Sequence, residues 1–151
     1  MRIVSMNAQY ALAITTWRYP PPYDCYDMTG ADPDVLASSF FALLDADEFI
    51  GFRSFGADGQ VPGWDYDNSA LDTGGGLRPD LTGVGLGRQA IQTGLDFGRS
   101  RFRPPAFRVT IAAFNQRAQR VVQALGFQKA GSFRGSADGR GYDILIRQET
   151  N

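Results

Sequence analysis

The stretch "RPDLTGVGLGRQAIQTGLDF", residues 78–97, decides the fold. Three glycines at alternate positions, Gly83, Gly85 and Gly87, lead directly into apolar residues at nearly helical spacing. The first backbone N–H groups of a helix have no partner inside it, and the helix dipole adds partial positive charge there. Glycine also lets the backbone approach a ligand closely. The stretch therefore favours either an anion-binding loop, most often for phosphate, or a tight turn that only packs a strand against a helix.

The residues around this loop restrict which phosphate compound it binds. A P-loop needs Gly-Lys-Ser/Thr, and the single lysine, Lys129, lies far along the chain. The segment from Gly85 to Ala90 has the glycine spacing of a dinucleotide-binding fingerprint. That fingerprint needs an acidic residue about 20 positions later, where this sequence has "FRVT". A nucleotide-binding oxidoreductase is therefore the weakest of the functions considered.

The composition excludes several kinds of chemistry. At 151 residues the chain fits a single domain, residues 1–151. It has no histidine, which excludes imidazole catalysis and histidine metal sites, and its one cysteine, Cys25, excludes an intrachain disulfide. A net charge of −1 gives no reason to expect a nucleic-acid partner. No apolar run approaches the ~20 residues of a membrane span and the N-terminus is a poor signal peptide, so we expect a cytoplasmic protein with no membrane partner.

Helix and strand signals are interleaved along the chain. The segment 39–55, "SFFALLDADEFIGFRSF", predicts a β-hairpin with an acidic turn. The segment 69–77, "SALDTGGGL", predicts a strand with a bulge or a close backbone approach at its glycines. We expect helices near residues 7–17, 32–38, 85–101 and 115–125, and further strands near residues 1–4, 107–114, 127–135 and 142–149. The predicted fold class is α/β (α+β), with helices interleaved around one mixed sheet.

A second motif follows the glycine loop. The segment from Asn115 to Gly131, "NQRAQRVVQALGFQKAG", has Asn-x-x-Ala at the start of a helix and Leu-Gly-Phe at its end. The strand "FRVTIAAF" separates it from the glycine loop. Both motifs, in this order and spacing, resemble the GNAT-type N-acetyltransferase family, whose cofactor signature is Arg/Gln-x-x-Gly-x-Gly/Ala opening a helix after a strand. The resemblance covers roughly residues 70–134 well and the remainder only in outline.

The resemblance implies a GNAT-like domain in which a mixed, mostly antiparallel sheet with splayed central strands is flanked by helices. It also implies that acetyl-CoA is the cofactor, that the loop amides hold its pyrophosphate, and that an amide near Gly76 or Leu77 stabilises the oxyanion. Arg88 and Arg117 either bind phosphate oxygens or lie on solvated helix faces. The implied cofactor-binding residues are Gly76, Leu77, Thr82, Gly83, Val84, Gly85, Leu86, Gly87, Arg88, Asn115 and Arg117.

Two positions depart from the family pattern. Thr82 occupies the place of the usual arginine or glutamine, and Val122 the place where many members carry a tyrosine. That tyrosine protonates the departing coenzyme A thiolate. Some members lack it, and solvent can serve because a thiolate is a fairly good leaving group near neutral pH. The general acid is therefore unassigned.

The groups that would act on the acceptor are less defined. Asp72 is the only carboxylate on the strand before the loop, where bases of the family often lie, so we interpret it as the catalytic base. The alternative is an acid paired with a nearby arginine. Aromatic and acidic residues cluster in the segments 17–27 and 64–67. Such clusters suit a cationic amine, or they anchor long loops onto the core.

The sequence thus predicts an acetyl-CoA-dependent N-acetyltransferase. Its acceptor is a primary amine, either of a small molecule or of a protein N-terminus. The alternative is a non-catalytic acyl-CoA-binding or sensing protein of the same fold, which Thr82 and Val122 favour. No metal ion is expected. Homodimerisation is common in the family, and the sequence identifies no interface for it.

Overall fold

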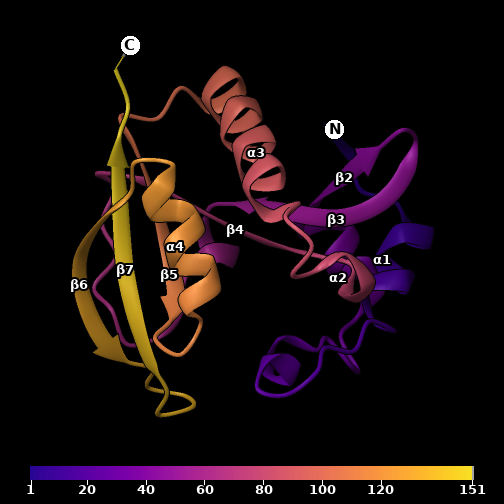
Figure 1. Cartoon of the computed structure of the whole chain (residues 1–151), viewed down its shortest axis with the longest axis horizontal. Coiled ribbons are helices and arrows are strands. Elements are labelled where there is room, and N and C mark those ends of the chain that lie inside the picture. Colours follow the sequence, from indigo (N-terminus) through magenta and orange to yellow (C-terminus); the bar gives the residue numbers. More distant parts are fainter. Residues whose placement is uncertain (151) are drawn as a thin grey trace. The chain divides into compact units, whose positions relative to one another are not determined.

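The computed structural model describes residues 1–150 (Figure 1). The α-helices are α1 (Ala8–Ile14), α2 (Pro33–Ser39), α3 (Gly87–Phe102) and α4 (Gln116–Ala124), and the short 3-10 helices are η1 (Tyr23–Tyr26), η2 (Ala57–Gly59) and η3 (Pro79–Leu81). The strands are β1 (Arg2–Ser5), β2 (Phe41–Asp45), β3 (Glu48–Phe55), β4 (Leu71–Leu77), β5 (Ala106–Ala112), β6 (Gln128–Arg134) and β7 (Gly141–Gln148). The chain forms two compact units. The first comprises Met1–Arg53 with Gly75–Gly94, and the second Ser54–Gly74 with the chain from Leu95 onward.

The first unit contains an antiparallel array of β1, β2 and β3. The predicted hairpin is present, and Ala46 and Asp47 form its turn at φ values of 49° and 66°. Two successive left-handed residues match the twist of the flanking strands. The side chain of Asn7 caps α1 by accepting a hydrogen bond from the Tyr10 N–H, and Asp32 caps α2. Local cap and turn chemistry therefore explains the boundaries of these elements.

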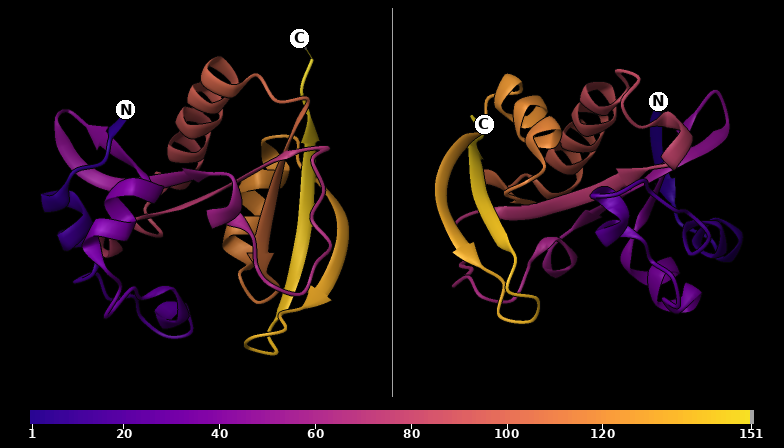
Figure 2. Two further views of the ribbon diagram at one scale, coloured as in Figure 1. Left: turned by 180° about the vertical axis from the view of Figure 1, so that it is seen from behind. Right: turned by 60° about the horizontal axis from the view of Figure 1, so that its bottom comes forward.

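The second unit contains the antiparallel strands β5, β7 and β6. β7 pairs with β5 from Ala106 opposite Gln148 to Ala112 opposite Tyr142. Helix α4 covers one face of β5 and β7 (Figure 2). It begins after Asn115, whose side-chain oxygen accepts a hydrogen bond from the N–H of Ala118, and it ends before Gly126, which has a φ of 98°.

The strands follow the order β1-β2-β3-β4-β5-β7-β6 in a seven-stranded sheet. β4 and β5 are parallel, whereas β1–β2, β2–β3, β5–β7 and β6–β7 are antiparallel. Within residues 1–150, β4 and β5 pair at Leu71 with Phe107 and at Asp72 with Arg108, and the pairing ends there. The predicted fold class, a mixed and mostly antiparallel sheet with splayed central strands, is confirmed.

Two helix boundaries differ from the predictions. The helix expected from Gly85 begins at Gly87, because the φ of 90° at Gly85 does not fit an α-helix. The helix expected to reach Trp17 ends at Ile14. There the hydroxyls of Thr15 and Thr16 donate to main-chain carbonyls of the preceding turn, at 2.6 Å each. The end of α1 therefore reflects local competition for backbone hydrogen bonds, whereas the start of α3 reflects the backbone angle at Gly85.

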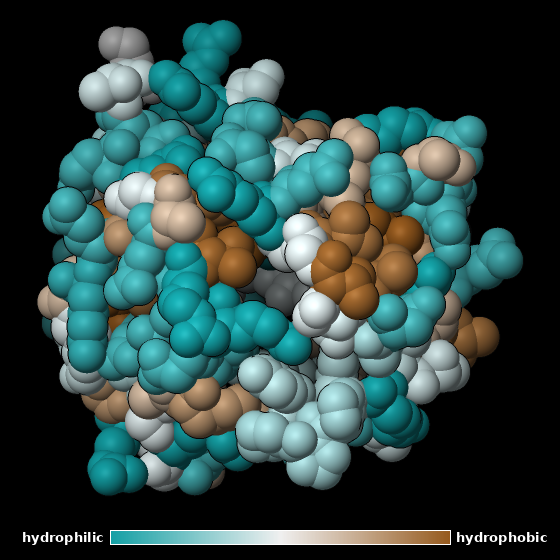
Figure 3. All heavy atoms as spheres, in the orientation of Figure 1, coloured by the Kyte–Doolittle hydropathy of each residue, from teal (hydrophilic) through white to brown (hydrophobic). Residues whose placement is uncertain are grey.

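Apolar side chains fill the interior of each unit. Ile14 and Leu43 are buried in the first unit, and Phe107 and Ile144 in the second. The face drawn in Figure 3 is mostly hydrophilic. Among residues 1–150, no helix combines the length and the apolar character needed to cross a bilayer.

Candidate functional site

The glycine loop lies in the first unit, between η3 and the start of α3. Gly83 and Gly85 adopt φ values of 71° and 90°, a region that favours glycine. A Cβ added at Gly85 or Gly87 would meet no atom within 4 Å, so open space adjoins the backbone at both positions. The sequence predicted a glycine loop at the start of this helix, and the structure has one.

The amides of this loop are available to a ligand. The first hydrogen bond of α3 runs from the N–H of Ala90 to the carbonyl oxygen of Leu86, at 3.0 Å. Within residues 1–150, the backbone N–H groups from Gly85 to Gln89 donate no hydrogen bond. Five successive donors at a helix N-terminus, beside open space, are suited to an anion. Arg88 lies in this same run and its side chain is exposed.

Arg78 fixes the chain just before the loop. Its guanidinium donates to Asp80 at 2.6 Å, to Glu48 at 2.8 Å and to the carbonyl oxygen of Phe49 at 3.2 Å. The hydrogen bonds to Asp80 and then Glu48 raise the pKa of Arg78, and Arg78 lowers the pKa of Asp80. Thr82, which replaces the family's longer polar residue, donates through its hydroxyl to the carbonyl oxygen of Pro79 at 2.8 Å. These contacts hold the loop against β3 and η3.

The glycine run in β4 packs closely against β3. A Cβ at Gly75 would overlap the carbonyl oxygen of Phe52 and the side chain of Arg53, and a Cβ at Gly76 would lie 3.1 Å from the Phe52 ring. The sequence of residues 69–77 predicted a bulge or a close backbone approach at these glycines. In the structure, close packing of β4 against β3 already requires glycine at Gly75.

A tyrosine fixes the end of β4. The hydroxyl of Tyr19 donates to the carbonyl oxygen of Leu77 at 2.6 Å, and the N–H of Tyr19 donates to Asp27 at 2.9 Å. Burial, followed by the charge of Asp27, raises the pKa of Tyr19 to about 12. The aromatic cluster of residues 17–27 is visible in the sequence but this contact is not, because no local signal joins residues 58 positions apart. Trp17 stacks on Phe49. Tyr19 and Trp17 therefore both anchor the segment of residues 17–27.

The predicted residues of the second motif lie in the second unit. Asn115 caps α4, and Arg117 is exposed in its first turn. Val122, at the place of the family's tyrosine, is 2% exposed. Gln119 donates to Asp143 of β7 at 2.8 Å and so ties α4 to the sheet. The side chain at position 122 therefore belongs to the core of this unit.

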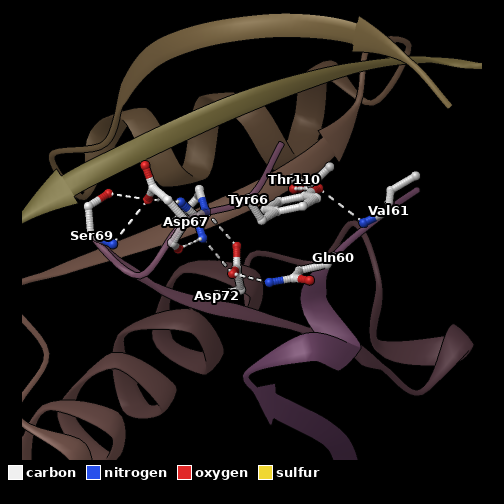
Figure 4. Close-up of polar contacts among 8 residues, drawn as sticks. Gln60, Val61, Tyr66, Asp67, Ser69, Asp72 and Thr110 are labelled. Atoms are coloured by element: carbon white, nitrogen blue, oxygen red, sulfur yellow. Dashed lines mark hydrogen bonds and ion pairs between the residues drawn. The ribbon is translucent and has the colours of Figure 1, made fainter. Parts of the chain in front are cut away.

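Asp72, the predicted base, is held by an ion pair in the second unit (Figure 4). Its side chain is 3% exposed, and its two oxygens accept from the Nε and Nη2 of Arg108, at 2.7 and 2.8 Å. Gln60 donates to Asp72 Oδ2 at 2.9 Å. The alternative interpretation of the sequence, an acid paired with an arginine, describes these contacts. An oxygen that is buried and already accepts two donors is poorly accessible to an amine.

Further polar contacts surround Arg108. Asp67 accepts from its Nη1 at 3.2 Å and, through the main-chain oxygen, from its Nη2 at 2.9 Å. The ring of Tyr66 lies 5.1 Å from the guanidinium carbon, within cation–π range. The hydrogen bond to Asp72 is the main cause that raises the pKa of Arg108. Hydrogen bonds from Ser69, followed by that from Arg108, lower the pKa of Asp67.

Tyr66 also links the loop of residues 60–67 to β5. Its hydroxyl lies 2.8 Å from Thr110 Oγ1 and accepts from the N–H of Val61 at 3.0 Å, as Figure 4 shows. Trp64 in the same loop lies against Gly131, where an added Cβ would come within 2.5 Å of its ring. The aromatic cluster of residues 64–67 therefore anchors a long loop, as one of the two interpretations of the sequence proposed.

Solved acetyltransferases share this architecture at low sequence identity. A spermidine N-acetyltransferase chimera from Vibrio cholerae and hSSAT has a TM-score of 0.74 and 14% identity, covering 98% of this chain and 96% of that chain. AAC(6')-Ib in complex with ribostamycin and coenzyme A has a TM-score of 0.74 and 16% identity. The match covers 98% of this chain and 93% of that chain. An acetyltransferase from Salmonella typhimurium with its cofactor acetyl-CoA has a TM-score of 0.68 and 16% identity. The match covers 97% of this chain and 92% of that chain. At such identities the likeness shows the fold. None of the curated proteins compared with the chain matches its sequence.

A mixed sheet whose central strands separate, followed by a glycine loop that opens a helix, defines the acetyltransferase class of folds. The sequence profile of the acetyltransferase (GNAT) domain matches residues 10–128. The chain belongs to this family, whose chemistry is acyl transfer. The match includes the glycine loop and α4, so the family resemblance seen in the two sequence motifs is confirmed.

Proposed function

We propose that this chain is an acetyl-CoA-dependent N-acetyltransferase that moves an acetyl group to a primary amine. The run of N–H groups from Gly85 to Gln89, with no acceptor in residues 1–150, carries the proposal. These groups and the positive end of the α3 dipole would bind the pyrophosphate of coenzyme A. Two solved proteins of the same fold contain coenzyme A or acetyl-CoA, which supports this ligand over other phosphate compounds.

In this proposal, the transfer of the acetyl group needs no proton-transferring side chain of the protein. The neutral amine attacks the thioester carbonyl carbon, a C–N bond forms and the C–S bond breaks. Water takes the proton that the amine nitrogen loses, and the departing thiolate takes a proton from water. Asp72 and Val122 have no part in this scheme, because one is bound to Arg108 and the other lies in the core.

Strand geometry favours one of the two candidate donors for the oxyanion. The N–H of Arg78 donates to the carbonyl oxygen of Ile50 in β3, at 2.7 Å. Successive residues of a strand point their N–H groups to opposite edges, so the N–H of Leu77 points away from β3. Of the two amides that the family resemblance implies, we therefore assign the oxyanion contact to Leu77 rather than Gly76.

The acceptor class in this proposal is a primary amine. One protein of the same fold is a spermidine N-acetyltransferase, and another was solved with ribostamycin. Both names support an amine acceptor for this chain. A small molecule and a protein N-terminus are both compatible with the contacts described for the first unit.

Calorimetric titration tests the proposal most directly. Acetyl-CoA is titrated into the purified protein, and NAD into a parallel sample. We expect micromolar binding of acetyl-CoA and none of NAD, followed by acetyl transfer in a screen of polyamines, aminoglycosides and peptides. Failure to bind acetyl-CoA would overturn the proposal.

Two observations favour a second function. The only carboxylate of β4 is committed to an ion pair, and a core valine occupies the place of the acid, which suits a protein that binds acyl-CoA without turnover. Binding of acetyl-CoA with no thioester cleavage above the uncatalysed rate, for every amine tried, would favour this function. If turnover occurs, the pH profile of Asp72→Asn decides its role. An unchanged acid limb removes Asp72 as the base, and a lost acid limb restores it.

A further inference from the structure

The peptide that ends β4 is held from two sides within the first unit. The hydroxyl of Tyr19 donates to the carbonyl oxygen of Leu77 at 2.6 Å. The N–H of the same peptide belongs to Arg78 and donates to the carbonyl oxygen of Ile50 in β3 at 2.7 Å. A trans peptide points its C=O and its N–H in opposite directions, so the Tyr19 hydroxyl lies at the edge of β4 that faces away from β3.

The N–H of Leu77 points to this same edge. The carbonyl oxygen of the preceding peptide, that of Gly76, lies against β3, because a Cβ added at Gly51 would come within 2.5 Å of it. The Leu77 N–H is on the opposite side of that peptide and therefore points away from β3. It is the donor assigned to the oxyanion in the proposed function. Tyr19 thus binds the carbonyl oxygen of the very residue whose N–H has that assignment.

Tyr19 is itself fixed in place. Its N–H donates to Asp27 Oδ1 at 2.9 Å, and its hydroxyl oxygen would lie 3.5 Å from a Cβ added at Gly76. Burial, followed by the charge of Asp27, raises the pKa of Tyr19 to about 12, so the hydroxyl keeps its proton at neutral pH and remains a donor. An anchored main chain and a protonated hydroxyl give the Leu77 carbonyl a defined partner.

The glycine loop has supports of its own beyond this peptide. The carbonyl oxygen of Arg78 accepts from the N–H of Leu81 at 2.9 Å, which closes η3. The guanidinium of Arg78 donates to Asp80 at 2.6 Å. Neither contact involves Tyr19. Loss of the Tyr19 hydroxyl should therefore affect the orientation of Leu77 more than the amides of the glycine loop.

We propose that Tyr19 is a positioning residue, which acts through the Leu77 carbonyl to aim the Leu77 N–H at the carbonyl oxygen of the acetyl thioester. The inference rests on the function proposed above, because it concerns the same reaction. A donor stabilises the oxyanion only when it is aimed at the oxygen that becomes negative, and small misplacements reduce rates strongly. Tyr19 does not touch the reacting atoms. It links the segment of residues 17–27 to turnover rather than to cofactor affinity.

Substitutions of Tyr19 and Asp27 test this role. Tyr19→Phe removes the hydroxyl and keeps the ring, and Asp27→Ala removes the acceptor of the Tyr19 N–H. Asp27→Asn is the matched control for Asp27→Ala, because it keeps an acceptor oxygen at that position. Tyr10→Phe is the matched control for Tyr19→Phe, because it removes a hydroxyl from the same unit and keeps the ring that stacks on Phe49.

Both kcat and the dissociation constant of acetyl-CoA are measured well below the unfolding temperature of each variant. The acceptor is the polyamine, aminoglycoside or peptide that the screen described above identifies. We expect kcat of Tyr19→Phe to fall at least about tenfold while the dissociation constant changes less than about twofold. The two control variants should keep the wild-type values. A stability defect alone would not separate the two constants in this way.

A double-mutant cycle shows whether Asp27 acts through Tyr19. Asp27→Ala should lower kcat in the wild-type background and have little further effect in Tyr19→Phe, because both changes release the same carbonyl. Additive losses would show that Asp27 acts by another route and would overturn the Asp27 step. An unchanged kcat in Tyr19→Phe would overturn the proposal. So would a weaker affinity for acetyl-CoA with kcat unchanged, which would assign the contact to cofactor binding.

Hydrogen exchange of the ligand-free protein keeps this inference separate from the proposed function. If the Tyr19 hydroxyl holds the end of β4, the amide of Arg78 should exchange at least about fivefold faster in Tyr19→Phe and not in Tyr10→Phe. Unchanged exchange overturns the positioning role even if the protein turns over acetyl-CoA. Faster exchange in a protein without turnover supports the hold on the strand end and overturns the proposed function, and with it the effect on catalysis.

Discussion

The hydroxyl of Tyr19 donates a hydrogen bond of 2.6 Å to the carbonyl oxygen of Leu77. Tyr19 follows α1, whereas Leu77 is the last residue of β4, and both belong to the first unit. Asp27 holds the main chain of Tyr19 at 2.9 Å. One side chain therefore connects the loop of residues 17–27 to the strand that leads into the glycine loop.

Tyr19→Phe should lower the free energy of unfolding by about 1 kcal/mol at neutral pH, because the Leu77 carbonyl loses its donor. The free energy of unfolding of the variant should also fall less at alkaline pH than that of wild type. The pKa of Tyr19 is about 12 when folded, against about 10 when unfolded. The folded protein holds this proton more tightly, so the stability it gives is complete below pH 10 and is lost as the pH rises through 12.

Urea unfolding between pH 9 and pH 12 measures this difference. Wild type should lose more stability over this range than Tyr19→Phe. Tyr10→Phe is the matched control, because it keeps the ring that stacks on Phe49. Equal losses in wild type and Tyr19→Phe would show that the Tyr19 hydroxyl is not held in the neutral form.

Gly87→Val should weaken acetyl-CoA binding at least about tenfold, or about 1.4 kcal/mol, with little effect on folding. The new side chain would enter the open space beside the free N–H groups without meeting any protein atom within 4 Å of its Cβ. Gly141→Val in β7 is a control for the loss of glycine itself, since a Cβ there makes only an ordinary contact of 3.6 Å with Ala113. Normal binding by Gly87→Val would show that the loop is only a turn.

Gly75→Ala should destabilise the protein by about 2 kcal/mol or more, because its Cβ overlaps the carbonyl oxygen of Phe52. A Cβ at Gly74 would lie 3.4 Å from Ser54 Oγ, so Gly74→Ala should lower the free energy of unfolding much less. Urea unfolding of both variants compares neighbouring glycines of one strand. A stable Gly75→Ala protein that fails to bind acetyl-CoA would favour the interpretation of the glycine run as ligand space.

Val122→Tyr should not restore the family's general acid. The larger ring overpacks the core of the second unit, where Val122 is 2% exposed, and we expect a loss of about 1–3 kcal/mol. Gln123→Tyr places the same ring on the exposed side of α4 and should be nearly neutral. Urea unfolding and kcat are measured for both variants. A higher kcat with unchanged stability would show that position 122 reaches the departing sulfur.

Local chemistry explains the features that sequence alone determined. The helix starts near Asn7, Asp32 and Asn115 and the glycine loop depend on interactions within a few residues, so they are visible in the order of residue types. The spacing of the two motifs carried the family resemblance, and the family match confirms it. Acetyl-CoA, the amine acceptor and a cytoplasmic location are predictions from the sequence, and the first two are part of the proposed function.

The tertiary structure decided what each buried side chain does. Asp72 belongs to an ion pair because Arg108, 36 residues away, is opposite it in the register. Gly75 is required by the carbonyl oxygen of Phe52, and Tyr19 binds a carbonyl 58 residues further along the chain. Such contacts depend on strand register and packing between distant segments, which residue order does not encode locally. The sequence therefore determined the class of fold and the position of the glycine loop, whereas only the folded chain showed that the carboxylate of Asp72 is bound to Arg108.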